Sequence, residues 1–119
     1  MDLLRKLVLA IGIAGALASA APAQDVRVFT DDTGRDVTIP VKPQRIVALQ
    51  DLFFTIPLIE LGVNPVGSMG RTADDGSHFI RSSKTVTGLD FDNSDIVYVG
   101  GSTPDLEAIA ALQPDLIIA

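Results

Sequence analysis

The sequence contains no cysteine, only one histidine and few basic residues. Without cysteine there is no disulfide, no thiolate ligand for zinc, no thiol nucleophile and no site for the lipid of a bacterial lipoprotein. The single histidine, His78, lies in a polar stretch where a solvated side chain is expected, and it cannot build a multi-histidine metal site. Nine Lys and Arg stand against fifteen Asp and Glu, a net charge of -6. We therefore expect no nucleic-acid partner and no stable membrane anchor.

The sequence also lacks the motifs of common catalytic and cofactor sites. It contains no G-x-S-x-G nucleophile turn, no G-x-G-x-x-G after a strand and no phosphate-binding P-loop. The acidic run 90–95 has Asp95 and Gly101 where a calcium-binding EF-hand needs Gly and Glu, so it is interpreted as a solvated acidic turn. These absences predict a chain that is not an enzyme by itself and has no cofactor and no resident metal ion.

The first 23 residues have the three parts of a cleavable signal peptide. Arg5 and Lys6 supply the positive start, and residues 7–17 form an apolar run too short to span a bilayer. Small residues at 18–20 and 21–23 offer two alternative A-x-A cleavage sites, between which the sequence does not decide. We expect an exported protein that works in the periplasm.

Residues 24–42 are predicted to form an N-terminal β-ribbon. Alternating residues at 26–30 and an apolar stretch at 37–39 flank the turn-forming residues 31–34, which is the pattern of a hairpin. The ribbon is expected to pack on the edge of the following domain, which spans residues 43–119.

That domain is predicted to be α/β, with a mostly parallel sheet flanked by helices. The apolar run 46–49 is typical of a buried strand, and a second strand is expected around Val66. Between them, Thr55 as N-cap, Pro57 in the first turn and Gly62 at the end predict a helix. Its buried face is predicted to comprise Leu58, Ile59 and Leu61.

The remaining segments continue this pattern. Residues 70–84 are polar and are expected to form a surface excursion, followed by extended segments at Val86 and at 95–99. A second helix is predicted with Thr103 as N-cap and Pro104 at its first position. Its apolar face is predicted to be Leu106, Ile109, Ala110 and Leu112, before Pro114 and a last buried strand at 116–118. A final core strand without a covering helix predicts that the lobe is incomplete.

Three segments carry a resemblance to a known family: 43–49 (PQRIVAL), 58–67 (LIELGVNPVG) and 104–118 (PDLEAIAALQPDLII). With the ribbon at 33–40, they resemble the periplasmic substrate-binding proteins of ABC importers for ferric siderophores, haem and cobalamin. That family has two α/β lobes joined by a long helix, with the ligand held between them. The resemblance implies an N-terminal lobe without the second lobe. It also implies a protein that captures a ferric siderophore or similar metal chelate and delivers it to an importer permease.

The ligand site is expected where the parallel strands end, since ligands bind beyond the carboxyl ends of such strands. The candidate ligand-binding residues are Gln50, Asp51, Leu52, Ser68, Met69, Arg71, Gly101 and Ser102. Arg71 can donate in a fork to the oxygens of an anionic chelate, although pairing with Asp74 or Asp75 alone is an open alternative. Arg45 lies at the opposite end of its strand and is interpreted as structural.

Glu107 is the candidate for docking to the permease. The resemblance implies that a glutamate at this position enters an arginine pocket of the permease. The helix dipole alone also favours a carboxylate near a helix start, so this explanation remains open.

Two other functions remain open: a lobe of an exported α/β enzyme, and a small exported envelope interaction protein. Zinc or manganese binding is less expected than chelate binding because there is one histidine. The sequence does not indicate which chelate is bound, nor which permease receives it.

Overall fold

A computed structural model describes residues 23–119 of the chain, so the predicted signal peptide lies outside the described residues apart from its last residue. Four short parallel strands form the central sheet, in the order β7-β4-β3-β8. Val47 of β3 lies opposite Gly67 of β4 on one side and Ile117 of β8 on the other. The strands are β3 (Ile46–Ala48), β4 (Gly67–Ser68), β7 (Val97–Tyr98) and β8 (Leu116–Ile118). The predicted α/β fold with a mostly parallel sheet is therefore confirmed.

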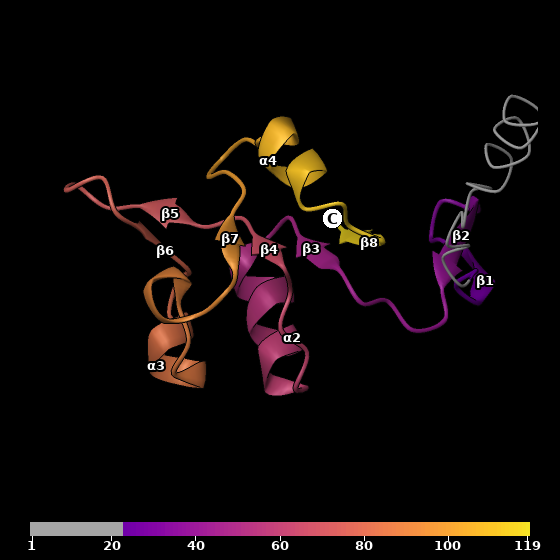
Figure 1. Cartoon of the computed structure of the whole chain (residues 1–119), viewed down its shortest axis with the longest axis horizontal. Coiled ribbons are helices and arrows are strands. Elements are labelled where there is room, and N and C mark those ends of the chain that lie inside the picture. The colour runs from indigo at the N-terminus through magenta and orange to yellow at the C-terminus, as the bar shows by residue number, and fades with distance from the viewer. Residues whose placement is uncertain (1–22) are drawn as a thin grey trace, which may run out of the picture.

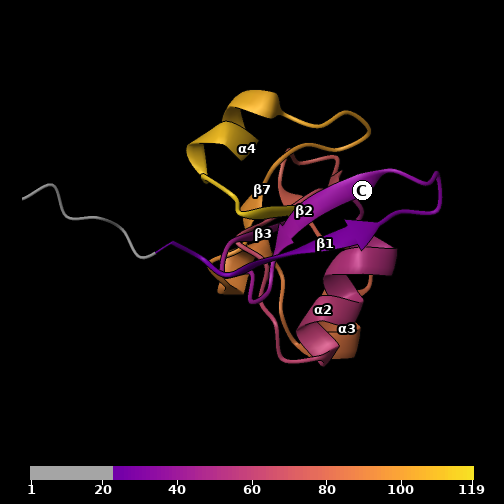
Figure 2. The ribbon, with the colours of Figure 1, turned by 90° about the vertical axis from the view of Figure 1, so that its right-hand side faces the viewer.

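Helices cover both faces of this sheet (Figures 1 and 2). The helix α4 (Leu106–Ala111) lies on one side, while α2 (Ile56–Glu60) and α3 (Ser83–Thr87) lie on the other. Each side has its own small core. Buried Val47, Val99 and Ile109 pack under α4, and buried Ile56, Ile80 and Ile96 pack near α2. Apolar burial on both faces is the main force that holds such a layered lobe together.

The segment before α2 starts earlier than the sequence predicts. A π-helical turn, η1 (Asp51–Thr55), leads directly into α2, and Gln50 is the N-cap, its side chain accepting a hydrogen bond from the Phe53 amide at 2.6 Å. The prediction of Thr55 as N-cap is wrong, because Thr55 already has helical angles and caps nothing. The earlier start changes the buried face: Ile56 is buried, whereas Leu61 is 80% exposed, contrary to prediction.

The helix α4 also begins differently from the prediction. Asp105 is its N-cap and accepts a hydrogen bond from the Ala108 amide at 3.0 Å. Pro104 stays outside the helix because it forms a β-bridge with Gly100, so Thr103 does not cap. Ile109 is buried and Leu112 packs against it as predicted. Leu106, at 72% exposure, and the exposed Ala110 are not part of the apolar face.

The segment 70–84, predicted to be a surface excursion, contains a hairpin, a core residue and the start of α3. The strands β5 (Arg71–Thr72) and β6 (His78–Phe79) pair in antiparallel fashion and project from the lobe (Figure 1). Ile80 follows and is 1% exposed. Val86 lies in α3 rather than in an extended segment, so that prediction is wrong. The 3-10 turn η2 (Phe91–Asn93) then leads to β7, within the stretch 95–99 that was predicted to be extended.

The N-terminal ribbon forms as predicted but does not pack on the sheet. Strands β1 (Val26–Thr30) and β2 (Asp36–Pro40) pair in antiparallel fashion, with Val26 opposite Pro40. The predicted packing on the domain edge is wrong, because the ribbon stands apart in Figure 1 and the whole of β1 is exposed. A hydrogen bond from Gln24 Nε2 to Asp115 Oδ2 at 3.0 Å ties its base to the lobe. None of the helices in residues 23–119 is long and apolar enough to cross a membrane.

Candidate functional site

Three loops meet at the carboxyl edge of the sheet, where β3, β4 and β7 end. Because these strands are parallel, their following loops lie at one edge, and two adjacent hollows of about 280 and 460 Å³ open between them. Both hollows are lined by Gly70, Arg71, Gly101 and Ser102. The smaller one adds Leu49, Gln50, Asp51, Met69 and Arg81, and the larger one adds Thr72, Tyr98 and Thr103.

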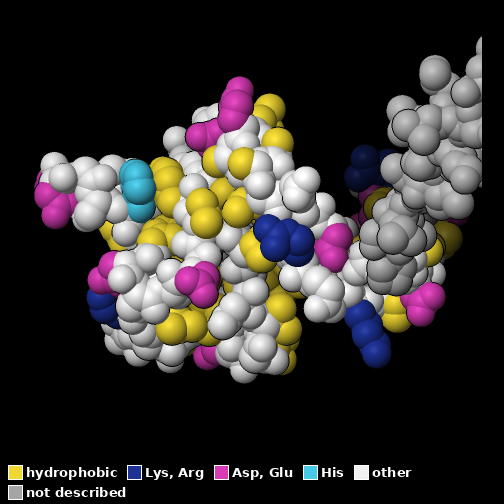
Figure 3. Space-filling view, in the orientation of Figure 1, with side chains coloured by type: hydrophobic (Ala, Val, Ile, Leu, Met, Phe, Trp, Pro, Cys, Tyr) yellow, Lys and Arg dark blue, Asp and Glu magenta, His cyan; other side chains and the backbone are white. Residues whose placement is uncertain are grey.

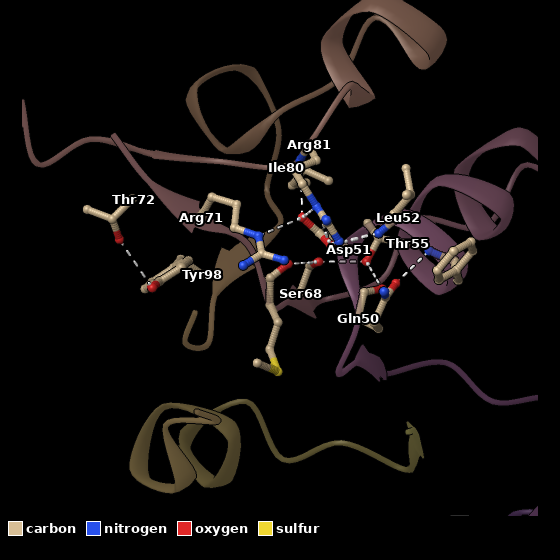
Figure 4. A network of polar contacts seen from close by, with 12 residues as sticks. Gln50, Asp51, Leu52, Thr55, Ser68, Arg71, Thr72, Ile80, Arg81 and Tyr98 are labelled. Atoms are coloured by element: carbon tan, nitrogen blue, oxygen red, sulfur yellow. Dashed lines mark hydrogen bonds and ion pairs between the residues drawn. The ribbon is translucent and has the colours of Figure 1, made fainter. Parts of the chain in front are cut away.

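Asp51 is the buried anionic residue of the smaller hollow, and 4% of its surface is exposed. Figure 4 shows its polar contacts. Its carboxylate accepts hydrogen bonds from Arg81 Nη2 at 2.6 Å, Arg81 Nε at 2.9 Å and the Leu52 amide at 2.9 Å. Burial alone would raise the pKa of Asp51, but the hydrogen bonds from Arg81 outweigh it and lower that pKa. Asp51 is therefore ionised at neutral pH, and both of its oxygens are already used within the lobe.

Arg71 is placed differently, although it also neighbours Asp51. Its side chain is 45% exposed, and its Nε lies 3.9 Å from Asp51 Oδ2, a distance too long for a hydrogen bond. The predicted alternative, in which Arg71 pairs with Asp74 or Asp75, is wrong, because the ion-pair partner of Arg71 is Asp51. Asp75 instead accepts hydrogen bonds from Ser77. The guanidinium of Arg71 thus lines both hollows with its donors available to a ligand.

Arg81 is a further charged residue of this site that no sequence pattern singles out, because it lies in the segment predicted to be a polar excursion. The loop is fixed by Ile80, whose amide donates to Asp90 Oδ1 at 2.7 Å. Asp90 is 8% exposed, so its interpretation as part of a solvated turn is wrong. Two guanidinium groups and one carboxylate leave this edge with one positive charge in excess. The apolar Phe79–Ile80 pair within the polar stretch was the available signal for a buried anchor there.

Two of the predicted ligand residues, Ser68 and Leu52, line neither hollow. Ser68 is fully buried, and its hydroxyl lies 2.6 Å from that of buried Thr55 and donates to the Met69 carbonyl. Leu52 packs against the core on the α2 side. Both residues therefore support the loops at the strand ends rather than facing the hollows.

An aromatic cluster borders the larger hollow, and no pattern in the sequence predicts it. Tyr98 of β7 is stacked on His78 of β6 with 3.7 Å between ring centroids, and Phe91 contacts it edge-on at 5.6 Å. His78 is exposed as expected, but it is held by this stack and by a 3.1 Å contact between its Nδ1 and Thr72 Oγ1. Within residues 23–119 no group of three or more His, Cys, Asp or Glu is arranged to hold a metal ion.

Glu107 and Arg45 lie away from the hollows. Glu107 is exposed in the first turn of α4. Arg45 donates from Nε and Nη2 to the Leu112 carbonyl at 2.8 and 2.6 Å, so it caps the end of α4, in accord with its structural interpretation. On the face seen in Figure 3, basic side chains are scattered and form no continuous stripe.

No family model matches the sequence. The chain is 36% identical over 98 residues to the Fe(3+)-citrate-binding protein YfmC of Bacillus subtilis, a match that covers 82% of this chain and 28% of YfmC. The chain thus spans less than a third of the length of that relative.

Solved structures of siderophore-binding proteins also match this chain. Staphylococcus aureus SirA, complexed with staphyloferrin B, matches with a TM-score of 0.55 and 30% identity over 78% of this chain and 29% of SirA. DesE, a ferric-siderophore receptor protein from Streptomyces coelicolor, matches with a TM-score of 0.55 and 27% identity over 77% of this chain and 29% of DesE. The periplasmic catecholate-siderophore binding protein VctP of Vibrio cholerae, at 21% identity and a TM-score of 0.53, shares the fold.

In fold, the chain is an α/β lobe similar to part of the ferric-siderophore-binding proteins. The chain matches part of such proteins in sequence as well as in fold. The resemblance indicated by segments 43–49, 58–67 and 104–118 is confirmed. The similar proteins are binding proteins or receptors by name.

Proposed function

We propose that this chain forms one lobe of an exported solute-binding protein that captures a ferric siderophore or related metal chelate for an ABC importer. The names of the similar proteins support an iron chelate as the ligand class, because they bind ferric citrate or ferric siderophores. They also make a catalytic lobe the less favoured alternative.

The observation that carries the proposal is the exposed guanidinium of Arg71 at the meeting point of the two hollows. Iron chelates such as ferric citrate present carboxylate oxygens, and a guanidinium fork binds such oxygens through two parallel hydrogen bonds. Asp51 is occupied by Arg81 and carries no free acceptor, so it does not compete for Arg71 at hydrogen-bonding distance. The single excess positive charge of the edge favours an anionic ligand.

The other lining residues complete the proposed capture surface without adding charge. Gln50, Met69, Gly101 and Ser102 line one or both hollows. The missing side chain of Gly101 leaves space beside the Tyr98 hydroxyl at the rim of the larger hollow, where a chelate can approach the backbone. The iron is the cargo, held by its own chelator, so the protein needs no metal ligands of its own.

A titration with ferric citrate tests the role of Arg71. We expect Arg71→Gln to weaken binding by about tenfold or more, because a charge-assisted contact contributes roughly 1.5–3 kcal/mol. Arg27→Gln is the matched control, since it removes the same charge from exposed β1, far from the hollows in the ribbon. Equal weakening by both variants would indicate general electrostatic attraction and would refute a site at Arg71.

Export to the periplasm is part of the proposal and is supported by the sequence of residues 1–23. VctP, which shares the fold, is described as periplasmic. Cell fractionation that places the mature protein in the cytoplasm would contradict the proposed location.

Delivery to a permease is proposed to use Glu107, which is exposed at the first turn of α4. Glu107→Ala is expected to reduce iron uptake by cells while leaving chelate affinity unchanged, since the residue lies outside both hollows. Glu60→Ala removes the other exposed glutamate, at the end of α2, and should leave uptake normal. Loss of chelate affinity in a folded Glu107→Ala protein would rule out a docking role.

A further inference from the structure

Tyr98 has a fixed orientation beside the larger hollow. His78 lies parallel to its ring, at 3.7 Å between centroids and an interplanar angle of 4°. Phe91 contacts the same ring from another side at 88°, in an edge-to-face arrangement. Stacked and edge-to-face contacts of this kind hold aromatic rings in defined positions. The ring is thus held from two directions by residues that come from β6 and η2.

The hydroxyl of Tyr98 has little to bond with inside the lobe. Among the described residues its polar contact is with Thr72 Oγ1 at 3.5 Å, the outer limit for a hydrogen bond (Figure 4). Tyr98 lines the hollow together with Arg71, Gly101 and Ser102. The space beside the hydroxyl exists because residue 101 is glycine: a Cβ there would lie 3.1 Å from the Tyr98 oxygen.

A buried or half-buried phenol normally has a good hydrogen-bond partner. Tyr98 is half-buried and its hydroxyl borders the same hollow as the available donors of Arg71. A phenol is a hydrogen-bond donor, and the acceptor that suits both groups is an anionic or carbonyl oxygen.

We propose that Tyr98 is a specificity-determining ligand contact, whose hydroxyl donates a hydrogen bond to an oxygen atom of the chelate that Arg71 holds. This inference rests on the proposed function and adds a second, neutral donor to the site. The fixed ring reduces the entropy lost on binding, because the donor is already oriented. His78 acts as a positioning residue: it holds the ring and does not need to touch the ligand.

The experiment is a calorimetric titration of the full-length protein with ferric citrate as the probe. Tyr98→Phe removes only the hydroxyl and keeps the stacked ring, so the fold should be unaffected. We expect its affinity to fall about threefold to tenfold, the usual effect of one lost hydrogen bond. His78→Ala should weaken binding to a similar degree, whereas His78→Phe, which keeps an aromatic ring in the stack, should bind like the wild type.

A spectroscopic readout separates contact from indirect effects. Tyr98 is the one tyrosine of this chain, so the part of the full-length protein's near-ultraviolet ligand difference spectrum that is absent in Tyr98→Phe reports on Tyr98. Gallium citrate is a colourless analogue of the ferric complex, and its binding should shift the tyrosine absorption to longer wavelength as the phenol donates its hydrogen bond.

The possible outcomes are distinct. Wild-type binding with weaker Tyr98→Phe binding and a tyrosine shift supports the inference. Equal affinities of wild type and Tyr98→Phe, or binding without a tyrosine shift, overturn the role of Tyr98 and leave the proposed function intact. A wild-type protein that binds neither ferric citrate nor other ferric chelates overturns the proposed function, and the Tyr98 contact with it.

Discussion

Replacing Asp51 with asparagine should destabilise the lobe and make its remaining stability less dependent on pH. The substitution keeps the size of the side chain and an acceptor for the Leu52 amide, but it removes the charge that binds Arg81. In the wild type, Arg81 donates to this carboxylate at 2.6 and 2.9 Å, from a site at which Asp51 is 4% exposed.

The magnitude follows from the contacts of the Asp51 carboxylate. A charge-assisted hydrogen bond contributes roughly 1.5–3 kcal/mol, and removing one partner of a buried pair costs more because the other charge loses its compensation. The Arg81 side chain is 36% exposed, however, so water can solvate it once it is released. We therefore expect a loss of about 2 kcal/mol in the free energy of unfolding at neutral pH.

The pH dependence has a definite sign. The pKa of Asp51 is lowered in the folded state, so the ion pair contributes its full stability above 3.8, the pKa of an ordinary aspartate. This contribution is lost as the pH falls below 3.8 through the folded-state pKa. The difference in stability between wild type and Asp51→Asn should therefore be largest at neutral pH and should shrink in acid.

Urea unfolding followed by circular dichroism at several pH values measures both effects. Asp92→Asn is the matched control, because Asp92 pairs with Lys84 at 2.6 Å but both side chains are more than half exposed. The control should change stability very little. An Asp51→Asn protein as stable as wild type at neutral pH, or a difference that persists unchanged in acid, would refute this reasoning.

Two further substitutions test how the lobe supports the site. Arg45→Ala removes both hydrogen bonds to the Leu112 carbonyl and should cost about 1 kcal/mol in thermal or urea unfolding, without changing chelate affinity; an unchanged stability would show that this cap is dispensable. Gly70→Ala places a Cβ 2.6 Å from Phe91 Cε2 and 2.7 Å from the Phe79 carbonyl, so it should destabilise the fold by about 1–3 kcal/mol and weaken ferric citrate binding. Normal affinity and stability in Gly70→Ala would show that the loop adjusts freely.

The sheet and its functional edge could be predicted from the sequence because their signals are local. The fully apolar Ile46–Ala48 indicates a strand buried on both faces, and the helix between it and β4 implies a parallel pair. Once the strands are parallel, the loops after them must share one edge, so Arg71 and Gly101 are expected to lie close together, and they line the same hollow.

The parts that could not be predicted depend on contacts between distant segments. Arg81 and Asp51 are thirty residues apart, and nothing in the polar stretch around Arg81 specifies that partner. The stack of Tyr98 on His78 likewise joins residues of two different sheets, which are twenty positions apart in the sequence. The predictions of the two N-cap residues were wrong for a different reason. Several residues near each helix start are able to cap, and at α4 the bridge between Gly100 and Pro104 leaves Asp105 as the N-cap.

The most direct test of the proposed function is a crystal structure of the full-length protein grown with ferric citrate, with the iron located by its anomalous scattering. We predict an iron peak beyond the carboxyl ends of β3, β4 and β7, with a carboxylate of the chelate in hydrogen-bonding contact with Arg71. A well-occupied iron site elsewhere, with both hollows empty and Arg71 making no contact, would contradict it.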